Sequence, residues 1–153
     1  MRYTVRRITQ IYTMDEQLYL KTNKFEHQNV KEDFINQVSF GEDFANWLIS
    51  EMSSLSEEGF LFSEPIMEDY GHGINVENGK DHFWVALSFA EEGPTKEPAH
   101  WVVTVATNNS ILKKLFGKIN ESKFHKLRDK IWSVIEENPD IRVFTEEEWM
   151  NLS

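Results

Sequence analysis

The clearest indication of the fold is "EDYGHGINVENGKDHFWVALSF", residues 68–89. On either side of Asn78-Gly79, a dipeptide typical of tight turns, apolar residues alternate with polar residues or glycine, which predicts a β-hairpin. The same period of two appears in "FLFSEPI", residues 60–66, and in "HWVVTVAT", residues 100–107. These three or four strands have connections too short for crossover helices, so we expect an antiparallel meander.

Helical spacing flanks this run of strands on both sides. Before it, apolar residues recur every three or four positions over residues 39–55, and Ser39 with Glu42 has the spacing of a capping box. After it, "ILKKLFG" at residues 111–117 and the apolar positions of residues 124–135 predict two further helices. We expect Ser110 to cap the first of these two helices.

Three shorter patterns complete the predicted architecture. Thr13 with Glu16 has capping-box spacing and predicts a short helix through Leu20. "IRVF" at residues 141–144 predicts a late strand, and Thr145 with Glu148 predicts the start of a terminal helical turn directly after it. The whole chain, residues 1–153, is therefore predicted to be a single α+β domain, with a β-meander of about four strands and helices before and after it packed on one face.

The turn at Asn78-Gly79 decides which hairpin side chains share a face. A two-residue type I′ turn sets Glu77 opposite Lys80 and puts His72 and His82 on opposite faces. A turn with a bulge at Gly79 instead brings the two histidines to one face. Hydrophobic matching favours the first register, because it joins the apolar residues of both strands into one row.

The first register also predicts a packing role for a strand glycine. It sets Gly73 opposite Trp84, so that a large aromatic ring covers the glycine. It also puts His72 on the core face, where we expect a hydrogen-bonded or edge histidine rather than a metal ligand.

Histidines and carboxylates of the hairpin are of the types that bind metals or transfer protons, namely Asp69, His72, Asp81 and His82. The favoured register separates the two histidines, which argues against a shared metal. The chain has no cysteine, no glycine-rich phosphate loop and no sequence motif of a zinc protease, calcium loop or serine hydrolase. We therefore expect no enzyme activity, metal or cofactor, with a small metal-dependent hydrolase as the alternative if the other register forms.

The net charge of −10 is concentrated in the middle of the chain. Residues 41–98 carry thirteen acidic and two basic side chains, whereas the segments on either side are close to neutral. Such a surface repels nucleic acid and anionic lipid and attracts a basic protein partner. The alternative is that the acids only keep the protein soluble. The candidate partner-binding residues are Glu57, Glu58, Glu64, Glu68, Asp69, Glu91 and Glu92, with Tyr70 and Trp84 as aromatic anchors.

Seven basic residues form a run on the late predicted helices, between Lys113 and Lys130. We interpret this run as the solvated face of amphipathic helices rather than a nucleic-acid site. No apolar run approaches the ~18 residues of a membrane span, and the basic N-terminus lacks the apolar core of a signal peptide. Together with the absence of cysteine, this favours a cytoplasmic protein.

Residues 64–118 resemble an arrangement seen in small uncharacterised bacterial α+β proteins. It consists of a Glu-Asp-Tyr-Gly strand, an aromatic-rich strand, a strand led by tryptophan and a short basic helix, although His72 stands here in place of an aromatic residue. This resemblance implies no activity. As an acidic single domain without catalytic motifs, the chain is also similar to the immunity proteins of bacterial toxin systems, which implies a basic toxin or effector as partner. The alternative is a regulatory or housekeeping domain.

Overall fold

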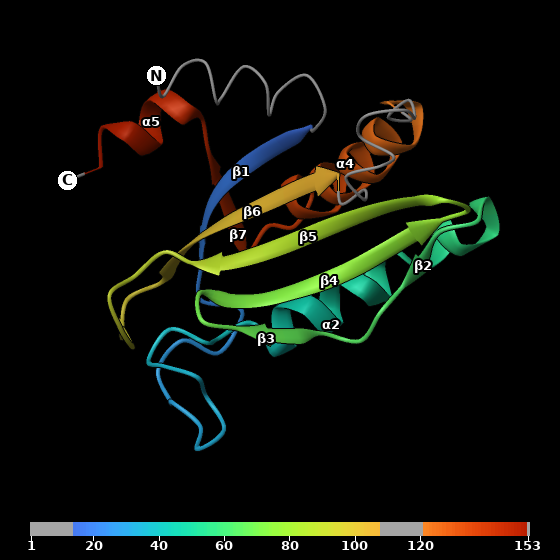
Figure 1. Cartoon of the computed structure of the whole chain (residues 1–153). Helices are drawn as coiled ribbons and strands as arrows, with labels where there is room; N and C mark the ends of the chain where they lie inside the picture. The colour runs from blue at the N-terminus through green and yellow to red at the C-terminus, as the bar shows by residue number, and fades with distance from the viewer. Residues whose placement is uncertain (1–13, 108–120, 153) are drawn as a thin grey trace, which may run out of the picture.

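The computed structural model describes residues 14–107 and 121–152. A seven-stranded antiparallel sheet runs through the molecule in the order β2-β4-β5-β6-β1-β7, with β3 also paired to β4 (Figure 1). The strands are β1 (Asp15–Thr22), β2 (Leu61–Phe62), β3 (Ile66–Glu68), β4 (Gly71–Asn78), β5 (Asp81–Phe89), β6 (Ala99–Thr107) and β7 (Ile141–Phe144). The helices are α2 (Glu42–Glu51), α4 (Glu121–Glu136) and α5 (Glu146–Met150), with a 3-10 helix at Ser53–Glu58.

The predicted α+β class and the meander are confirmed, but the sheet is larger than expected. β4, β5 and β6 form the meander, and the chain's first strand, β1, adds to the far side of β6. The late strand β7 then pairs with β1. β1 pairs with strands that are distant from it in sequence, β6 and β7, and a local sequence pattern does not predict such pairings.

The prediction of a helix from Thr13 to Leu20 was wrong, because Asp15–Thr22 is the strand β1. Leu18, Leu20 and Thr22 alternate on the buried side, and Leu18 and Leu20 lie opposite Val103 and Trp101 of β6. Two apolar residues at positions i and i+2, such as Leu18 and Leu20, are compatible with a half-buried strand and also with a short helix. Pairing with β6 on one side and β7 on the other decides for the strand.

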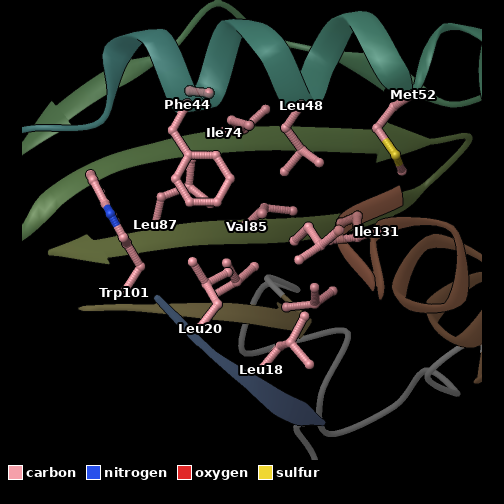
Figure 2. Packing of buried hydrophobic residues seen from close by; sticks show 14 of the residues in the cluster. Leu18, Leu20, Phe44, Leu48, Met52, Ile74, Val85, Leu87, Trp101 and Ile131 are labelled. Carbon is pink, nitrogen blue, oxygen red and sulfur yellow. The ribbon is translucent and has the colours of Figure 1, made fainter. Parts of the chain in front are cut away.

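Two helices cover one face of the sheet, as expected. Figure 2 shows Phe44 and Leu48 of α2 and Ile131 of α4 directed onto buried side chains of the strands, such as Val85 and Leu20. The third helix departs from the prediction that all helices lie on one face. Trp149 of α5 stacks on Tyr19, with ring centroids 5.1 Å apart, and Tyr19 points away from the core side of β1. We call the face covered by α2 and α4 the inner face, and the opposite face the outer face.

The expected helix starts are confirmed in one case and wrong in another. Thr145 caps α5 in a full capping box with Glu148. Ser39, however, does not cap α2, which begins after Gly41 (φ 120°) without a side-chain cap. The Ser39 hydroxyl instead donates a hydrogen bond to the backbone oxygen of Glu68, 3.0 Å away. The predicted helix at residues 111–117 and its cap lie outside the described residues.

The hairpin turn lies one position further along the chain than expected. Asn78 pairs with Asp81, so the two-residue loop is Gly79-Lys80, with Gly79 at φ 62° as its first residue. A glycine with positive φ at this position is typical of a type II′ turn. The pairs Glu77–Lys80 and Gly73–Trp84 are therefore wrong, but the assignment of residues to faces is correct, because the register shifts by an even number of residues.

Candidate protein-binding surface

Three loops meet at the end of the sheet where β5 ends and β6 begins. They are residues 23–41 between β1 and α2, the turn at residues 69–70 between β3 and β4, and residues 90–98 between β5 and β6. Figure 1 shows the first and last of these loops extending from the same end of the sheet. The loops and the first turn of α2 form one surface, which we call the acidic end (residues 23–43, 68–70 and 90–98).

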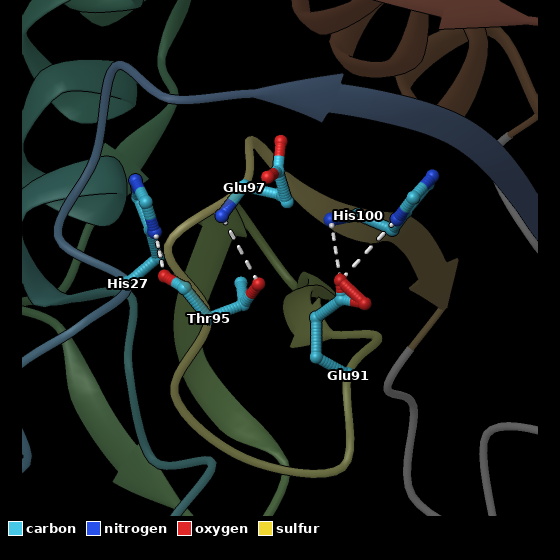
Figure 3. Close-up of polar contacts among 5 residues, drawn as sticks. All are labelled: His27, Glu91, Thr95, Glu97 and His100. Carbon is cyan, nitrogen blue, oxygen red and sulfur yellow. Dashed lines mark hydrogen bonds and ion pairs between the residues drawn. The ribbon is translucent and has the colours of Figure 1, made fainter.

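Hydrogen bonds join the three loops to one another. Figure 3 shows His27, whose Nδ1 lies 2.6 Å from the backbone oxygen of Thr95. A carbonyl only accepts, so Nδ1 carries the hydrogen. The amide of Thr95 donates back to the backbone oxygen of His27, at 2.9 Å. The Asn36 side-chain amide donates to the backbone oxygen of Asp69 at 2.7 Å, which fastens the first loop to the β3–β4 turn.

A second histidine holds the other side of the loop at residues 90–98. Glu91 Oε2 lies 3.3 Å from both the backbone nitrogen and Nδ1 of His100, the second residue of β6 (Figure 3). The amide of Glu97 donates to the hydroxyl of Thr95. Hydrogen bonds within the chain therefore hold the loop at residues 90–98 at several points.

The charge of this surface is strongly negative. Its three segments contain ten carboxylates and three lysines. The carboxylates are Glu26, Glu32, Asp33, Glu42, Asp43, Glu68, Asp69, Glu91, Glu92 and Glu97. Segments far apart in sequence contribute carboxylates to the acidic end. Its negative charge is therefore more concentrated in space than the order of residues along the chain suggests.

Some of these carboxylates are oriented by the backbone. Glu26 accepts hydrogen bonds from the Asn29 side chain and from the amides of Gln28 and His27, which lowers the pKa of Glu26 below its ordinary value. Asp43 accepts from the amide of Glu26 at 2.7 Å. A cavity of about 240 Å³ opens beside them, lined by Glu26, Lys31, Phe34, Phe40, Gly41, Glu42, Asp43 and Asn46.

The two predicted aromatic anchors lie together on the outer face. The Trp84 indole nitrogen donates a hydrogen bond to the Tyr70 hydroxyl at 3.1 Å. Burial raises the pKa of Tyr70, and the charges of Glu68 and Asp69 act in the same direction, while the bond from Trp84 opposes them. Tyr70 belongs to the β3–β4 turn, so this pair is continuous with the acidic end.

The structure brings only some of the predicted partner-binding residues together. Glu68, Asp69, Tyr70, Glu91 and Glu92 belong to the acidic end. Glu64 is exposed on the segment between β2 and β3.

Glu57 and Glu58 lie at the opposite end, and Glu58 forms an ion pair with Lys126 of α4.

Six of the ten carboxylates in the acidic end were not among the residues predicted from the sequence. They are Glu26, Glu32, Asp33, Glu42, Asp43 and Glu97. The acidic pairs Glu32-Asp33 and Glu42-Asp43 are the local sequence signal for four of them, and nothing in the sequence joins these pairs to the loop at residues 90–98.

The basic run of the late helices is largely paired within the molecule, as far as it is described. Lys123 lies 3.0 Å from a carboxylate oxygen of Asp81, and Arg128 forms an ion pair with Glu16. These pairs join α4 to the sheet. Contacts with carboxylates disfavour a role of the same side chains in binding phosphates.

A metal site at the hairpin is not supported by its geometry. His72 is buried on the inner face, where its Nδ1 donates to the backbone oxygen of Phe40 at 3.1 Å. His82 lies on the outer face, 3.7 Å from a carboxylate oxygen of Glu77. Within residues 14–107 and 121–152, no group of three or more histidine, aspartate or glutamate side chains is arranged to hold a metal ion.

Comparison of the chain with protein-family models, curated proteins and solved structures finds no match. In the described part of the chain, no helix combines the length and the apolar character that crossing a membrane requires.

Proposed function

We propose that this protein is an acidic protein-binding module, and that its acidic end binds a basic surface of a partner protein. The observation that carries the proposal is the convergence of ten carboxylates and three lysines on three hydrogen-bonded loops at one end of the sheet. Like charges so close together disfavour the compact state. A basic partner relieves this repulsion.

Two physical properties suit such a surface to fast and specific association. The negative field steers a basic partner towards the site and raises the association rate at low salt. The hydrogen bonds of His27, Asn36 and Glu91 hold the loops in one arrangement, so little conformational freedom remains to be lost on binding.

The partner class that we propose is a basic toxin or effector, with the protein acting as an immunity-type inhibitor. An enzyme that acts on nucleic acid needs a positively charged active site, because its substrate is a polyanion. An acidic, preformed surface that covers this site blocks access of the substrate. The resemblance of the chain to immunity proteins supports this class.

The test is capture of partners on the immobilised chain, with elution by a salt gradient. We expect basic proteins to be retained at 50 mM salt and released well below 500 mM. A variant with Asp33→Asn, Glu92→Gln and Glu97→Gln removes three exposed charges of the acidic end and should lose this retention. Binding is then quantified with each purified protein, and a captured toxin or nuclease should lose activity when the chain is added.

The matched control removes three exposed charges elsewhere, with Glu51→Gln, Glu121→Gln and Glu136→Gln. Both variants have the same net charge, so a difference between them reports on position rather than on total charge. If both variants retain the partner equally, or if no partner is released by salt, the proposal is wrong.

A further inference from the structure

Trp84 differs from the other four tryptophans in what its ring contacts. Trp47, Trp101 and Trp149 each pack against other aromatic rings, and Trp132 packs against the hydrophobic core. Trp84 lies half-buried on the outer face of β5. Throughout the described residues, no other ring and no lysine or arginine stacks on Trp84.

The position of the Trp84 ring is fixed by contacts from the sheet and from Tyr70. The ring lies over Gly73, where a Cβ atom would stand only 1.8 Å from Cζ2 of the indole. The hydrogen bond to the Tyr70 hydroxyl holds the nitrogen edge. The ring therefore has a defined orientation, and part of it remains exposed to solvent.

The surroundings of this ring are apolar and negatively charged. On the outer face of β2–β5, the carboxylates are Glu68 of β3 and Glu77 of β4, and these strands contain no lysine or arginine. On the outer face, Ile66 pairs with Gly73, and Leu61 pairs with Glu77 at the edge of the sheet. Ile66 and Leu61 are 37% and 64% exposed. A flat aromatic ring with apolar neighbours and acidic groups around it is suited to a planar cation.

We propose that the outer face of β2–β5 is a docking surface for an arginine-bearing segment of the basic partner, with the guanidinium stacked on Trp84. This inference rests on the proposed function and extends it to a second contact, adjacent to the acidic end through Tyr70. Guanidinium groups stack on tryptophan more often than ammonium groups do, and the partner's positive charge complements Glu64, Glu68 and Glu77. The alternative role of Trp84 is only to cover Gly73.

The experiment uses the full chain labelled with 5-fluorotryptophan, which gives one ¹⁹F resonance for each of the five tryptophans. The resonance that disappears in Trp84→Phe is assigned to Trp84. A hexa-arginine peptide and a hexa-lysine peptide of equal charge serve as probes. We expect the Trp84 resonance to move on addition of hexa-arginine, and to move less with hexa-lysine.

Affinities of the variants complete the test. Trp84→Leu should weaken binding of hexa-arginine about two- to fivefold and that of hexa-lysine by less, with Trp84→Phe in between. The triple variant of the acidic end should weaken both peptides equally. If the Trp84 resonance does not move in the wild-type chain while the acidic end still binds, Trp84 only covers Gly73 and the docking surface is wrong, whereas the proposed function survives. If neither peptide binds, both proposals are contradicted.

Discussion

Gly71 and Gly73 lie on the outer face of β4, and each allows a close approach that a Cβ atom would block. At Gly71 (φ 150°), the added atom would meet the backbone oxygen of Leu87 at 2.1 Å, whereas at Gly73 it would meet the Trp84 ring. A backbone oxygen within a sheet cannot move away, but a side chain can rotate. The two glycines should therefore differ in how much an alanine costs.

We expect Gly71→Ala to lower the free energy of unfolding by about 3 kcal/mol and Gly73→Ala by about 1 kcal/mol, the two ends of the range for overpacking. In a Trp84→Ala background, Gly73→Ala should cost close to zero, because the clashing ring is gone. Urea denaturation of the single and double variants measures both effects. An unchanged cost of Gly73→Ala in that background would show that the ring is not what fills the space.

His72 should contribute to stability through its hydrogen bond rather than through chemistry. His72→Leu leaves the buried oxygen of Phe40 without its donor, which costs about 1–3 kcal/mol. His82 lies on the outer face, so His82→Leu should lower the free energy of unfolding by much less than His72→Leu does. Thermal unfolding compares the two variants, and equal losses would contradict the difference in burial that the fold gives them.

Tyr70 should titrate above the ordinary range of a tyrosine, because burial raises its pKa. The step that Tyr70→Phe removes from the absorbance titration at 295 nm identifies it. Trp84→Phe should raise the pKa of Tyr70 further, since the lost hydrogen bond favours the phenolate. Because the pKa of Tyr70 is higher in the folded state than in the unfolded state, its contribution to stability is fully present at a pH below the unfolded-state pKa. This contribution is lost as the pH rises through the folded-state pKa. Tyr70→Phe should therefore lose less stability than wild type above about pH 10.

At the scale of elements, β1 and α5 show how partners decide local structure. β1 lies between β6 and the edge strand β7, and its last residue, Thr22, donates a hydrogen bond to the backbone oxygen of Asp140 at 2.8 Å. α5 has no buried residues of its own, and its docking depends on Trp149 against Tyr19, Phe144 and His100. The capping box of Thr145 fixes where this short helix begins.

We expect Thr145→Ala to destabilise α5 locally by about 1 kcal/mol, because the amide of Glu148 loses its acceptor. Amide hydrogen exchange at residues 146–150 should accelerate about fivefold, while exchange in β5 stays unchanged. Asn151→Ala, at the other end of α5, is the control and should change little. Exchange that accelerates throughout the sheet would contradict a local role of the cap.

Across the whole molecule, the two ends of the sheet differ in how their charged side chains are paired. At one end, Lys123 and Lys126 pair with Asp81 and Glu58, so the charges stabilise the docking of α4. At the acidic end, the carboxylates outnumber the lysines and repel one another. A surface that binds a partner commonly lowers the stability of the free protein.

The triple variant Asp33→Asn, Glu92→Gln and Glu97→Gln should therefore raise the free energy of unfolding, by about 0.5 kcal/mol at low salt and by less at 0.5 M NaCl. Glu91→Ala should instead lower it by about 1 kcal/mol, because the backbone amide and Nδ1 of His100 lose the oxygen that accepts their hydrogen bonds. Urea denaturation at both salt concentrations distinguishes them. Equal destabilisation by both variants would show that the exposed acids stabilise the fold.

Several local features of the fold were predictable from the sequence, because short-range interactions cause them. Alternation along residues 68–89 gave β4 and β5 and the faces of their side chains, and helical spacing gave α2 and α4. The capping-box spacing of Thr145 and Glu148 predicted the start of α5. The composition shows that the protein is acidic and has no cysteine. These features follow from periods of two and 3.6 residues and from short-range hydrogen bonds.

Which distant segments meet depends on tertiary contacts that no local pattern predicts. The segment predicted to be a helix is the strand β1, paired with β6, and the hairpin turn lies at Gly79-Lys80, which shifts the pairing of β4 and β5 by two residues without changing their faces. The acidic end likewise depends on the meeting of His27 with Thr95 and of Asn36 with Asp69. Long-range packing and backbone pairing outweigh weak local preferences, and they alone bring these carboxylates together.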